Sequence, residues 1–261
     1  MAGSSYALLA VLLAADPAAP ATEGGSSGTP AGEATEAGVA PVELIPRLEL
    51  RQSFAKLEGG ASVHITTTEI DIGFAGRVLL RYEGEIRVIS SPTAGQISGF
   101  GDARVSAIGL IASAPRYVAV VIAGGVFNTA SQPPLGDGKQ QLVLGGAAAV
   151  SPVRWWLPYL IVQEEVSVAG DSARPDINQL VGRLGNIVFG PGFTWYKLDL
   201  DGLLDFQRDA GQLFGRLEAG SLLVGRTGLF IRAGTQLAGT RQLDYSMEVG
   251  IRYLFRLEKG R

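Results

Sequence analysis

Large apolar residues recur at every second position from Val42 to Phe255. In "YSMEVGIRYLF" (245–255), six of them alternate with serine, glutamate, glycine, arginine and leucine: Tyr245, Met247, Val249, Ile251, Tyr253 and Phe255. Residues 44–54, 69–74 and 197–207 show the same alternation. A period of two is typical of strands with one apolar face, and no segment shows the 3.6-residue period of an amphipathic helix. The sequence therefore predicts an all-β fold.

Turn-forming segments divide this region into strands. Eleven breaks leave twelve strands, and the breaks are 58–60, 74–77, 90–101, 113–116, 128–139, 151–154, 169–176, 190–192, 207–211, 225–228 and 238–242. Most strands reach the roughly 9–11 residues that a tilted membrane strand needs. The even-numbered breaks are tight, whereas the odd-numbered ones include all the long polar loops, a pattern typical of outer-membrane barrels.

The pattern therefore predicts a closed antiparallel transmembrane β-barrel of about twelve strands, with both chain ends on the side of the short turns. The break at "FAGR" (74–77) is the least certain, because the alternation from Ile70 to Tyr82 runs through it in phase. Without a turn there, the count becomes ten strands.

A water-soluble β-sandwich also alternates, with its apolar face in the core. Strand length favours the barrel, because the strands run to about 12–16 residues against a usual mode of about 5–6. Aromatic residues near strand ends favour it too, since interfacial girdles lie there. We expect ten of them in the girdles: Tyr117, Phe127, Trp155, Trp156, Tyr159, Phe189, Trp195, Tyr245, Tyr253 and Phe255.

The polar face of the strands carries closely spaced charges of both signs. In a membrane barrel this face lines the lumen. The candidates for the lining are Arg47, Glu49, Arg51, Glu69, Asp71, Lys197, Asp199, Asp201, Arg216, Glu218, Arg232, Glu248 and Arg252. These charges either line an aqueous path and set its selectivity, or pair across the lumen and close it.

Composition limits the partners. The net charge of −3 gives no reason to expect a nucleic-acid partner. The mean hydropathy is positive, at +0.22, and cysteine is absent, which excludes disulfides and thiolate metal sites. We expect contact with outer-membrane lipid, small-molecule solutes and the barrel assembly machinery, and neither a cofactor nor a metal.

The N-terminal region differs from the rest of the chain. The apolar run Tyr6–Ala15 is too short to span a membrane but suits a secretory signal, although "MAGSS" lacks a basic residue. We expect a signal peptide over 1–15, a low-complexity linker over 16–41, the barrel over 42–257 and a short tail over 258–261. Outer-membrane barrels usually end at their last aromatic residue, so the tail after Phe255 was not expected.

Catalytic chemistry has little support in the sequence. His64 is the only histidine, so a hydrolase of the outer membrane would have to use it as its base, beside Ser62 and Glu69. An ordinary polar strand residue is the alternative interpretation. The stretch "GDSARPDINQ" contains Asp171, Arg174, Asp176 and Asn178, and Arg174 could pair with either aspartate. We expect this stretch to be a rigid extracellular loop or a gate at the pore mouth.

Two motifs carry a resemblance to a known family. "GFGDARVSAIGL" (99–110) and "SVAGDSARPDINQL" (167–180) resemble outer-membrane barrels named for the meta-pathway of phenol degradation, and "LGDGKQQLVLGGAAAV" (135–150) is similar to their glycine-rich central strand. The resemblance runs from about Arg47 to Phe255. The sequence departs from the family pattern in loop 128–139 and in the tail. The resemblance implies an outer-membrane barrel that transports small compounds, aromatic ones among them, and it brings no catalytic site.

Three functions follow as hypotheses. The first is passive passage of small solutes through a charge-lined lumen. The second is a structural or binding barrel with a lumen closed by salt bridges. The third is a lipid-active enzyme that uses His64.

Overall fold

The computed structural model describes residues 40, 44–224, 226–240 and 242–255. The predicted signal segment 1–15, nearly all of the linker 16–41 and the tail 258–261 lie outside the described residues. The strands are β1 (Arg47–Leu57), β2 (Ser62–Phe74), β3 (Val78–Ser91), β4 (Gly95–Phe100), β5 (Ala103–Ala114), β6 (Tyr117–Phe127), β7 (Lys139–Val150), β8 (Trp156–Gly170), β9 (Asn178–Phe189), β10 (Thr194–Asp205), β11 (Ala210–Val224), β12 (Thr227–Gly239) and β13 (Leu243–Leu254). Short 3-10 helices follow β1, β6 and β9: η1 (Glu58–Gly60), η2 (Pro133–Leu135) and η3 (Pro191–Phe193). Among the described residues, no helix is long and apolar enough to cross a membrane.

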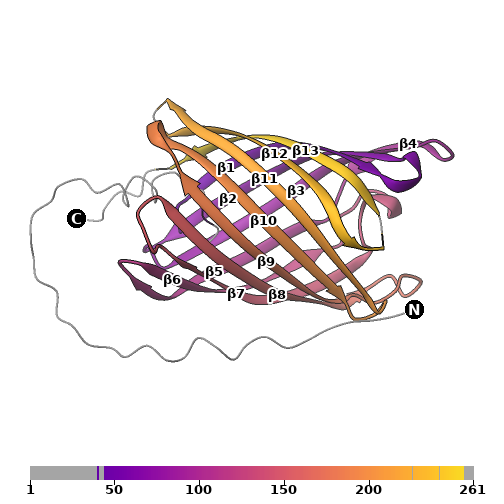
Figure 1. The fold of residues 1–261 in the computed structure, drawn as a ribbon. Helices are drawn as coiled ribbons and strands as arrows, with labels where there is room; N and C mark the ends of the chain where they lie inside the picture. Colours follow the sequence, from indigo (N-terminus) through magenta and orange to yellow (C-terminus); the bar gives the residue numbers. More distant parts are fainter. Residues whose placement is uncertain (1–39, 41–43, 225, 241, 256–261) are drawn as a thin grey trace, which may run out of the picture.

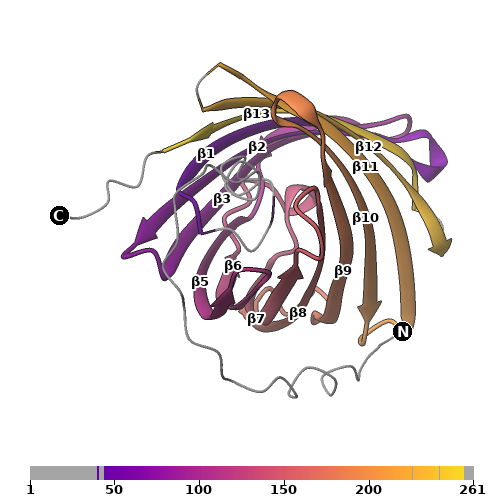
Figure 2. The ribbon, with the colours of Figure 1, turned by 60° about the vertical axis from the view of Figure 1, so that its left-hand side comes forward.

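The strands form one antiparallel sheet that closes on itself (Figures 1 and 2). Closure is made by β1 and β13, which pair from Arg47 opposite Leu254 to Leu57 opposite Leu243. Closing the sheet satisfies the backbone groups that an edge strand would expose, which is a requirement for strands in hydrocarbon. The all-β closed barrel that the alternation predicts is therefore confirmed.

Twelve strand positions make the barrel, although the described residues contain thirteen strands. Strand β3 pairs with β4 through its second half and with β5 through its first half. Strands β4 and β5 thus occupy one position, interrupted at Gly101 and Asp102. The β3–β4 hairpin projects beyond the barrel rim (Figure 1), inside the segment 90–101 expected to be only a loop.

The uncertain break at "FAGR" is a genuine turn. Ala75 and Gly76 have φ angles of 49° and 65°, and positive φ at both central residues defines the type I′ turn that fits the twist of a hairpin. Strands β2 and β3 pair in register up to Phe74 opposite Val78. The twelve-strand count is therefore right, and the ten-strand alternative is wrong.

The two ends of the barrel differ. The short connections β2–β3, β5–β6, β7–β8, β9–β10 and β11–β12 lie at one end, which we call the tight-turn end, together with the start of β1 and the end of β13. The projecting hairpin and the loops 128–138 and 171–177 lie at the other, the loop end. The first strand therefore begins, and the last strand ends, at the tight-turn end, as an even number of strand positions requires.

Apolar and charged side chains are distributed inside out relative to a water-soluble protein. Every one of the twelve barrel positions exposes large apolar side chains on its outer face, and carboxylates and guanidiniums are buried on the inner face. On β11, for example, Leu217 is 63% exposed and Glu218 is 4% exposed. A soluble sandwich would bury the apolar face, so that alternative is excluded.

Candidate functional site: the charged lumen of the barrel

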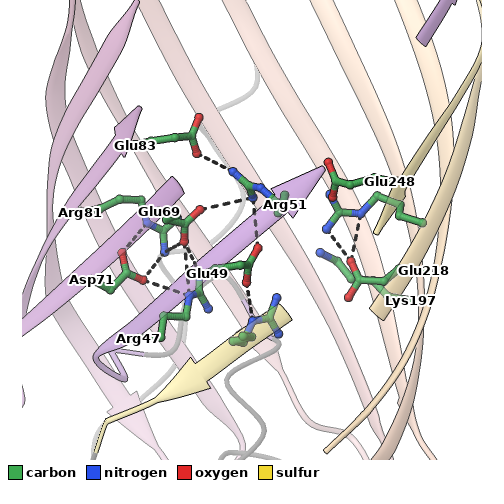
Figure 3. A network of polar contacts seen from close by, with 12 residues as sticks. Arg47, Glu49, Arg51, Glu69, Asp71, Arg81, Glu83, Lys197, Glu218 and Glu248 are labelled. Atoms are coloured by element: carbon green, nitrogen blue, oxygen red, sulfur yellow. Dashed lines mark hydrogen bonds and ion pairs between the residues drawn. The ribbon is translucent and has the colours of Figure 1, made fainter. Parts of the chain in front are cut away.

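All thirteen charged residues expected on the lining lie on the inner face. Nine of them are almost fully buried: Arg47, Glu49, Glu69, Asp71, Lys197, Asp199, Asp201, Glu218 and Arg252. The other four are half-buried: Arg51, Arg216, Arg232 and Glu248. They come from six strands, namely β1, β2 and β10 to β13. Figure 3 shows several of them, including Glu49, Glu69 and Glu218.

Glu69 is the centre of the densest group. Its carboxylate is 2.8 Å from Nη2 of Arg47, 3.2 Å from Nη2 of Arg81 and 3.4 Å from Nη1 of Arg51. Asp71 shares two of these guanidiniums, at 3.1 Å from Arg47 Nε and 2.8 Å from Arg81 Nη2. Figure 3 shows the five side chains converging from β1, β2 and β3. Each carboxylate thereby has the opposite charges that burial requires.

The network continues around the wall on both sides of β1. Arg252 Nε lies 2.5 Å from Glu49 across the closure between β13 and β1. Arg232 stands between Glu218 and Glu248, at 2.5 Å from each. The indole N–H of Trp195 donates to the other oxygen of Glu218 at 2.8 Å.

These ion pairs follow the wall and do not cross the lumen. Nearly all join charges on one strand, on adjacent strands or on next-but-one strands, as between Arg51 on β1 and Glu83 on β3. The widest is between Arg104 on β5 and Glu165 on β8, three strand positions apart. Pairing of this kind neutralises the wall without bridging the barrel.

The opposite wall is different. Strands β5 to β8 face the lumen near the tight-turn end with small and aliphatic side chains, including Ile108, Val120, Ile122 and Ala147. Tyr159, Trp195 and Phe230 join them in one buried cluster, and Ala40, fully buried, belongs to it as well. The lumen therefore has a charged wall and, at the tight-turn end, a buried apolar cluster that we expect to be its constriction.

Sequence reasoning missed several lumen charges. They are Arg81, Glu83, Glu85, Arg87, Arg104, Lys139, Glu165 and Arg183, all partly or fully buried in ion pairs. The stretch "RYEGEIR" (81–87) already alternates charged residues with others at period two. This alternation is visible in the sequence, but it does not show which residues point inward unless the turn at 74–77 is known.

Three aromatics expected in the girdles lie inside the barrel instead. Tyr159 and Trp195 are buried in the lumen, and Phe189 packs against the same apolar cluster. Trp195 shares its face with Lys197 and Asp199, so its inward direction follows from the same alternation. The other seven are on the outer surface, and Tyr245 there contacts Phe54 with ring centroids 6.0 Å apart.

Inward aromatic rings cover glycines on neighbouring strands. A β-carbon on Gly185 would lie 2.1 Å from the Tyr159 ring, and one on Gly250 would lie 2.3 Å from the Phe230 ring. At Gly220 a β-carbon would lie 2.2 Å from Trp195 Cζ2 and 2.8 Å from the Leu229 carbonyl oxygen. The missing side chains let the rings pack directly against the neighbouring strand.

We expect Gly220→Val to destabilise the barrel by about 1–3 kcal/mol, because the buried Trp195 ring cannot yield to an overpacked neighbour. Gly182→Val is the matched control, since a β-carbon there meets no atom within 4 Å. Guanidinium unfolding in detergent, followed by tryptophan fluorescence, measures both. Equal stability of the two variants would contradict the packing argument.

Comparisons with known proteins agree with this architecture. No protein-family model matches the chain, and no curated protein sequence matches it. Among solved structures, an outer membrane channel from Pseudomonas putida F1 has a TM-score of 0.62 at 15% identity, covering 81% of this chain and 94% of that one. The NanC porin has a TM-score of 0.58 at 8% identity, covering 80% and 100%. The KdgM porin has a TM-score of 0.55 at 10% identity, covering 80% and 99%.

The chain has the fold of an outer-membrane channel. This confirms the coarser part of the sequence resemblance, the outer-membrane barrel. The membership in the family named for phenol degradation stays a prediction.

In this channel fold, the loop residues singled out from the sequence hold two loops together. Arg174 Nη1 donates to the carbonyl of Gly136 at 3.1 Å, and its Nη2 donates to the carbonyl of Pro133. It thus contacts the loop 128–138, whereas the sequence suggested a pair with Asp171 or Asp176. Asp171 instead accepts the amide of Ala173 at 2.9 Å.

Asp176 and Asn178 complete this contact. Asp176 accepts a hydrogen bond from Lys139 Nζ at 2.7 Å, and this bond, with the charge of Lys139, lowers the pKa of the Asp176 carboxyl. Asn178 begins β9, and its carbonyl accepts the amide of Phe206 at 2.8 Å. Asp102, from the break between β4 and β5, accepts amides of Ala130 and Asp137. Loops 128–138 and 171–177 are therefore fastened to each other and to the rim.

We expect Arg174→Gln to raise amide hydrogen exchange in residues 133–138 by roughly tenfold, because two hydrogen bonds that tie this segment are lost. Exchange in the β7 and β8 strands should not change. Arg208→Gln, in the β10–β11 turn, is the control with the same loss of charge. Unchanged exchange at 133–138 would show that Arg174 does not hold the loop.

His64 is on the outer face of the barrel. Its ring packs against Phe54 with centroids 4.8 Å apart in an edge-on arrangement. Glu69, the acid closest in sequence, faces the lumen from the other side of the same strand. The two side chains are therefore separated by the wall, and His64 lacks the geometry of a catalytic base in a Ser-His-acid site.

Proposed function

We propose that this protein is an outer-membrane channel for the passive passage of small solutes. The observation that carries the proposal is the direction of the ion pairs. Buried charges pair along the wall between neighbouring strands, which neutralises them, and the ion pairs found among the described residues do not cross the axis of the lumen. A twelve-strand barrel lies between the filled eight-strand and the open sixteen-strand types, so a narrow path suits this size.

The apolar outer face supports the location. Exposed leucines, isoleucines and valines surround the barrel between aromatic residues at its ends, which matches lipid and its interfaces. The outer-membrane lipid and the barrel assembly machinery are the partners that this location implies. The tight-turn end would face the periplasm and the loop end the exterior.

The two-sided lumen suits a particular kind of solute. Charged side chains on β9–β13 and β1–β3 face small and aliphatic side chains that β5–β8 present near the tight-turn end, whereas toward the loop end these strands carry Arg104, Lys139 and Glu165. A molecule with one charged group and an apolar body can contact both. Small aromatic compounds, which the family resemblance suggests, are one such class.

The test is conductance in planar lipid bilayers with the purified full chain. We expect discrete, voltage-independent current steps, small because of the apolar constriction. A bilayer that stays silent after verified insertion would reject the channel. Insertion is verified by the heat-modifiable gel shift of reisolated protein.

One observation favours a second function, a structural or binding barrel with a closed lumen. The constriction is a continuous buried cluster that includes Ala40. If this cluster blocks passage permanently, neutralising Asp199 and Asp201 would destabilise the fold with no current to alter. A current that changes in these variants would reject the closed barrel.

A further inference from the structure

A small group of charges on the inner wall has an excess of positive charge. Asp201 on β10 accepts Arg183 Nε from β9 at 2.5 Å on one carboxylate oxygen. Its other oxygen accepts Arg216 Nε from β11 at 2.8 Å, with Nη2 of the same guanidinium at 2.6 Å. Two guanidiniums thus share one carboxylate, and the trio carries a net charge of about +1.

The carboxylate of this trio is almost fully buried, whereas the two arginine side chains are partly exposed. The side chain of Asp201 is 12% exposed, whereas those of Arg183 and Arg216 are 31% and 28% exposed. Among the described residues, the Nη1 and Nη2 atoms of Arg183 have no hydrogen-bond partner. Both oxygens of Asp201 are occupied, so the donors still available belong to the arginines.

A cavity lies against this trio in the loop-end half of the lumen. Its volume is about 300 Å³. Besides the trio, its lining includes the apolar side chains of Val181, Leu203, Phe214 and Leu243, together with Gly202, Thr235 and Ser246. The next carboxylate along β10, Asp199, is already held by Lys197 Nζ at 3.2 Å and by the hydroxyl of Tyr159. The cavity therefore offers guanidinium donors at one side and apolar side chains at the other.

We propose that this cavity is a binding site for small carboxylates with an apolar body. A guanidinium fork matches the two oxygens of a carboxylate, and Val181, Leu203 and Phe214 cover the body. Arg183 supplies the free donors, while Asp201 orients both guanidiniums and competes with the ligand for them. The proposal rests on the proposed channel function, because it names the solute class that the lumen would select.

Hexanoate is the probe, and hexanamide is the control with the same body but no charge. Binding to the detergent-solubilised full chain is measured by isothermal titration calorimetry. We expect hexanoate to bind at least tenfold more tightly than hexanamide. Arg183→Gln and Arg216→Gln should each weaken hexanoate binding by roughly tenfold, whereas Arg208→Gln, a loop arginine outside the cavity, should leave it unchanged.

Asp201→Asn should have the opposite effect on hexanoate binding. Removing the competing carboxylate should strengthen hexanoate binding several-fold, an outcome that a general loss of structure would not produce. Binding of hexanamide equal to hexanoate, no binding of either, or weakening by Asp201→Asn in a folded variant would each overturn the site. Where a charge variant fails to fold, the comparison of hexanoate with hexanamide on the native chain still decides.

The calorimetry and the conductance test separate the two proposals. Current without carboxylate binding would leave the channel standing and reject the site. Binding without current would leave the site standing and reject the channel.

Discussion

Replacing Glu69 with glutamine should lower the free energy of unfolding by about 3–5 kcal/mol, the cost typical of removing one partner from a buried ion network. Three guanidiniums, from Arg47, Arg51 and Arg81, lie within 3.4 Å of this carboxylate. Asp71 still pairs with two of them after the change. Arg47 and Arg81 would then share the single carboxylate of Asp71, while Arg51 keeps its contacts with Glu49 and Glu83, in a part of the lumen where Glu69 is 3% exposed.

Glu83→Gln is the matched control. Glu83 belongs to the same network but contacts Arg51 alone, at 2.9 Å, and is 27% exposed. A partly exposed pair of this kind contributes less than a buried network, about 1 kcal/mol. Guanidinium unfolding in detergent micelles compares the two variants, and a Glu69→Gln variant as stable as Glu83→Gln would show that the network is not cooperative.

Replacing Trp195 with alanine should raise the single-channel conductance by roughly twofold or more, because an apolar constriction limits water and ions where it is narrowest. Trp195 is fully buried in the apolar cluster at the tight-turn end. Removing its ring uncovers Gly220 and widens the lumen between β10 and β12. The cost is stability, about 3–5 kcal/mol for a buried tryptophan, so recordings are made well below the unfolding temperature.

Trp156→Ala controls for the loss of an aromatic ring at the same end. Trp156 is on the outer surface, 36% exposed, and donates to Asn186 at 3.1 Å. Its removal should leave the conductance within error of the native channel. A native-like conductance in Trp195→Ala would place the narrowest point elsewhere.

Alternation along the chain was sufficient for the fold class and the direction of most side chains. Turn-forming residues predicted twelve strands, and the structure decided between twelve and ten by showing a turn at 74–77. Period two assigns Glu248 and Arg252 to one face and Met247, Val249 and Ile251 to the other, and the structure places them so. The same rule applied strictly to β10 would have placed Trp195 with Lys197 in the lumen. Trp195 lies near a strand end, but this position does not place it in a girdle, because the alternation along β10 decides which way its side chain points.

The closing strand "YSMEVGIRYLF" shows what the sequence by itself determined. Backbone geometry sends successive side chains to opposite faces, so one apolar face, one charged face and aromatic ends follow from the order of residues alone. The register between strands does not follow. Which carboxylate meets which guanidinium depends on how β1 aligns with β2 and with β13, and the second of these pairings joins the two ends of the barrel, which local pattern does not encode.

Only the tertiary structure decided the partners of the charges and the shape of the lumen. It placed Arg183 and Arg216 on either side of Asp201, from strands separated by a turn and a loop. It brought Arg174 to loop 128–138 and Ala40 into the apolar cluster. The physical reason is that each contact depends on the register between strands or on the packing of segments that are not neighbours in the sequence, and local alternation encodes neither.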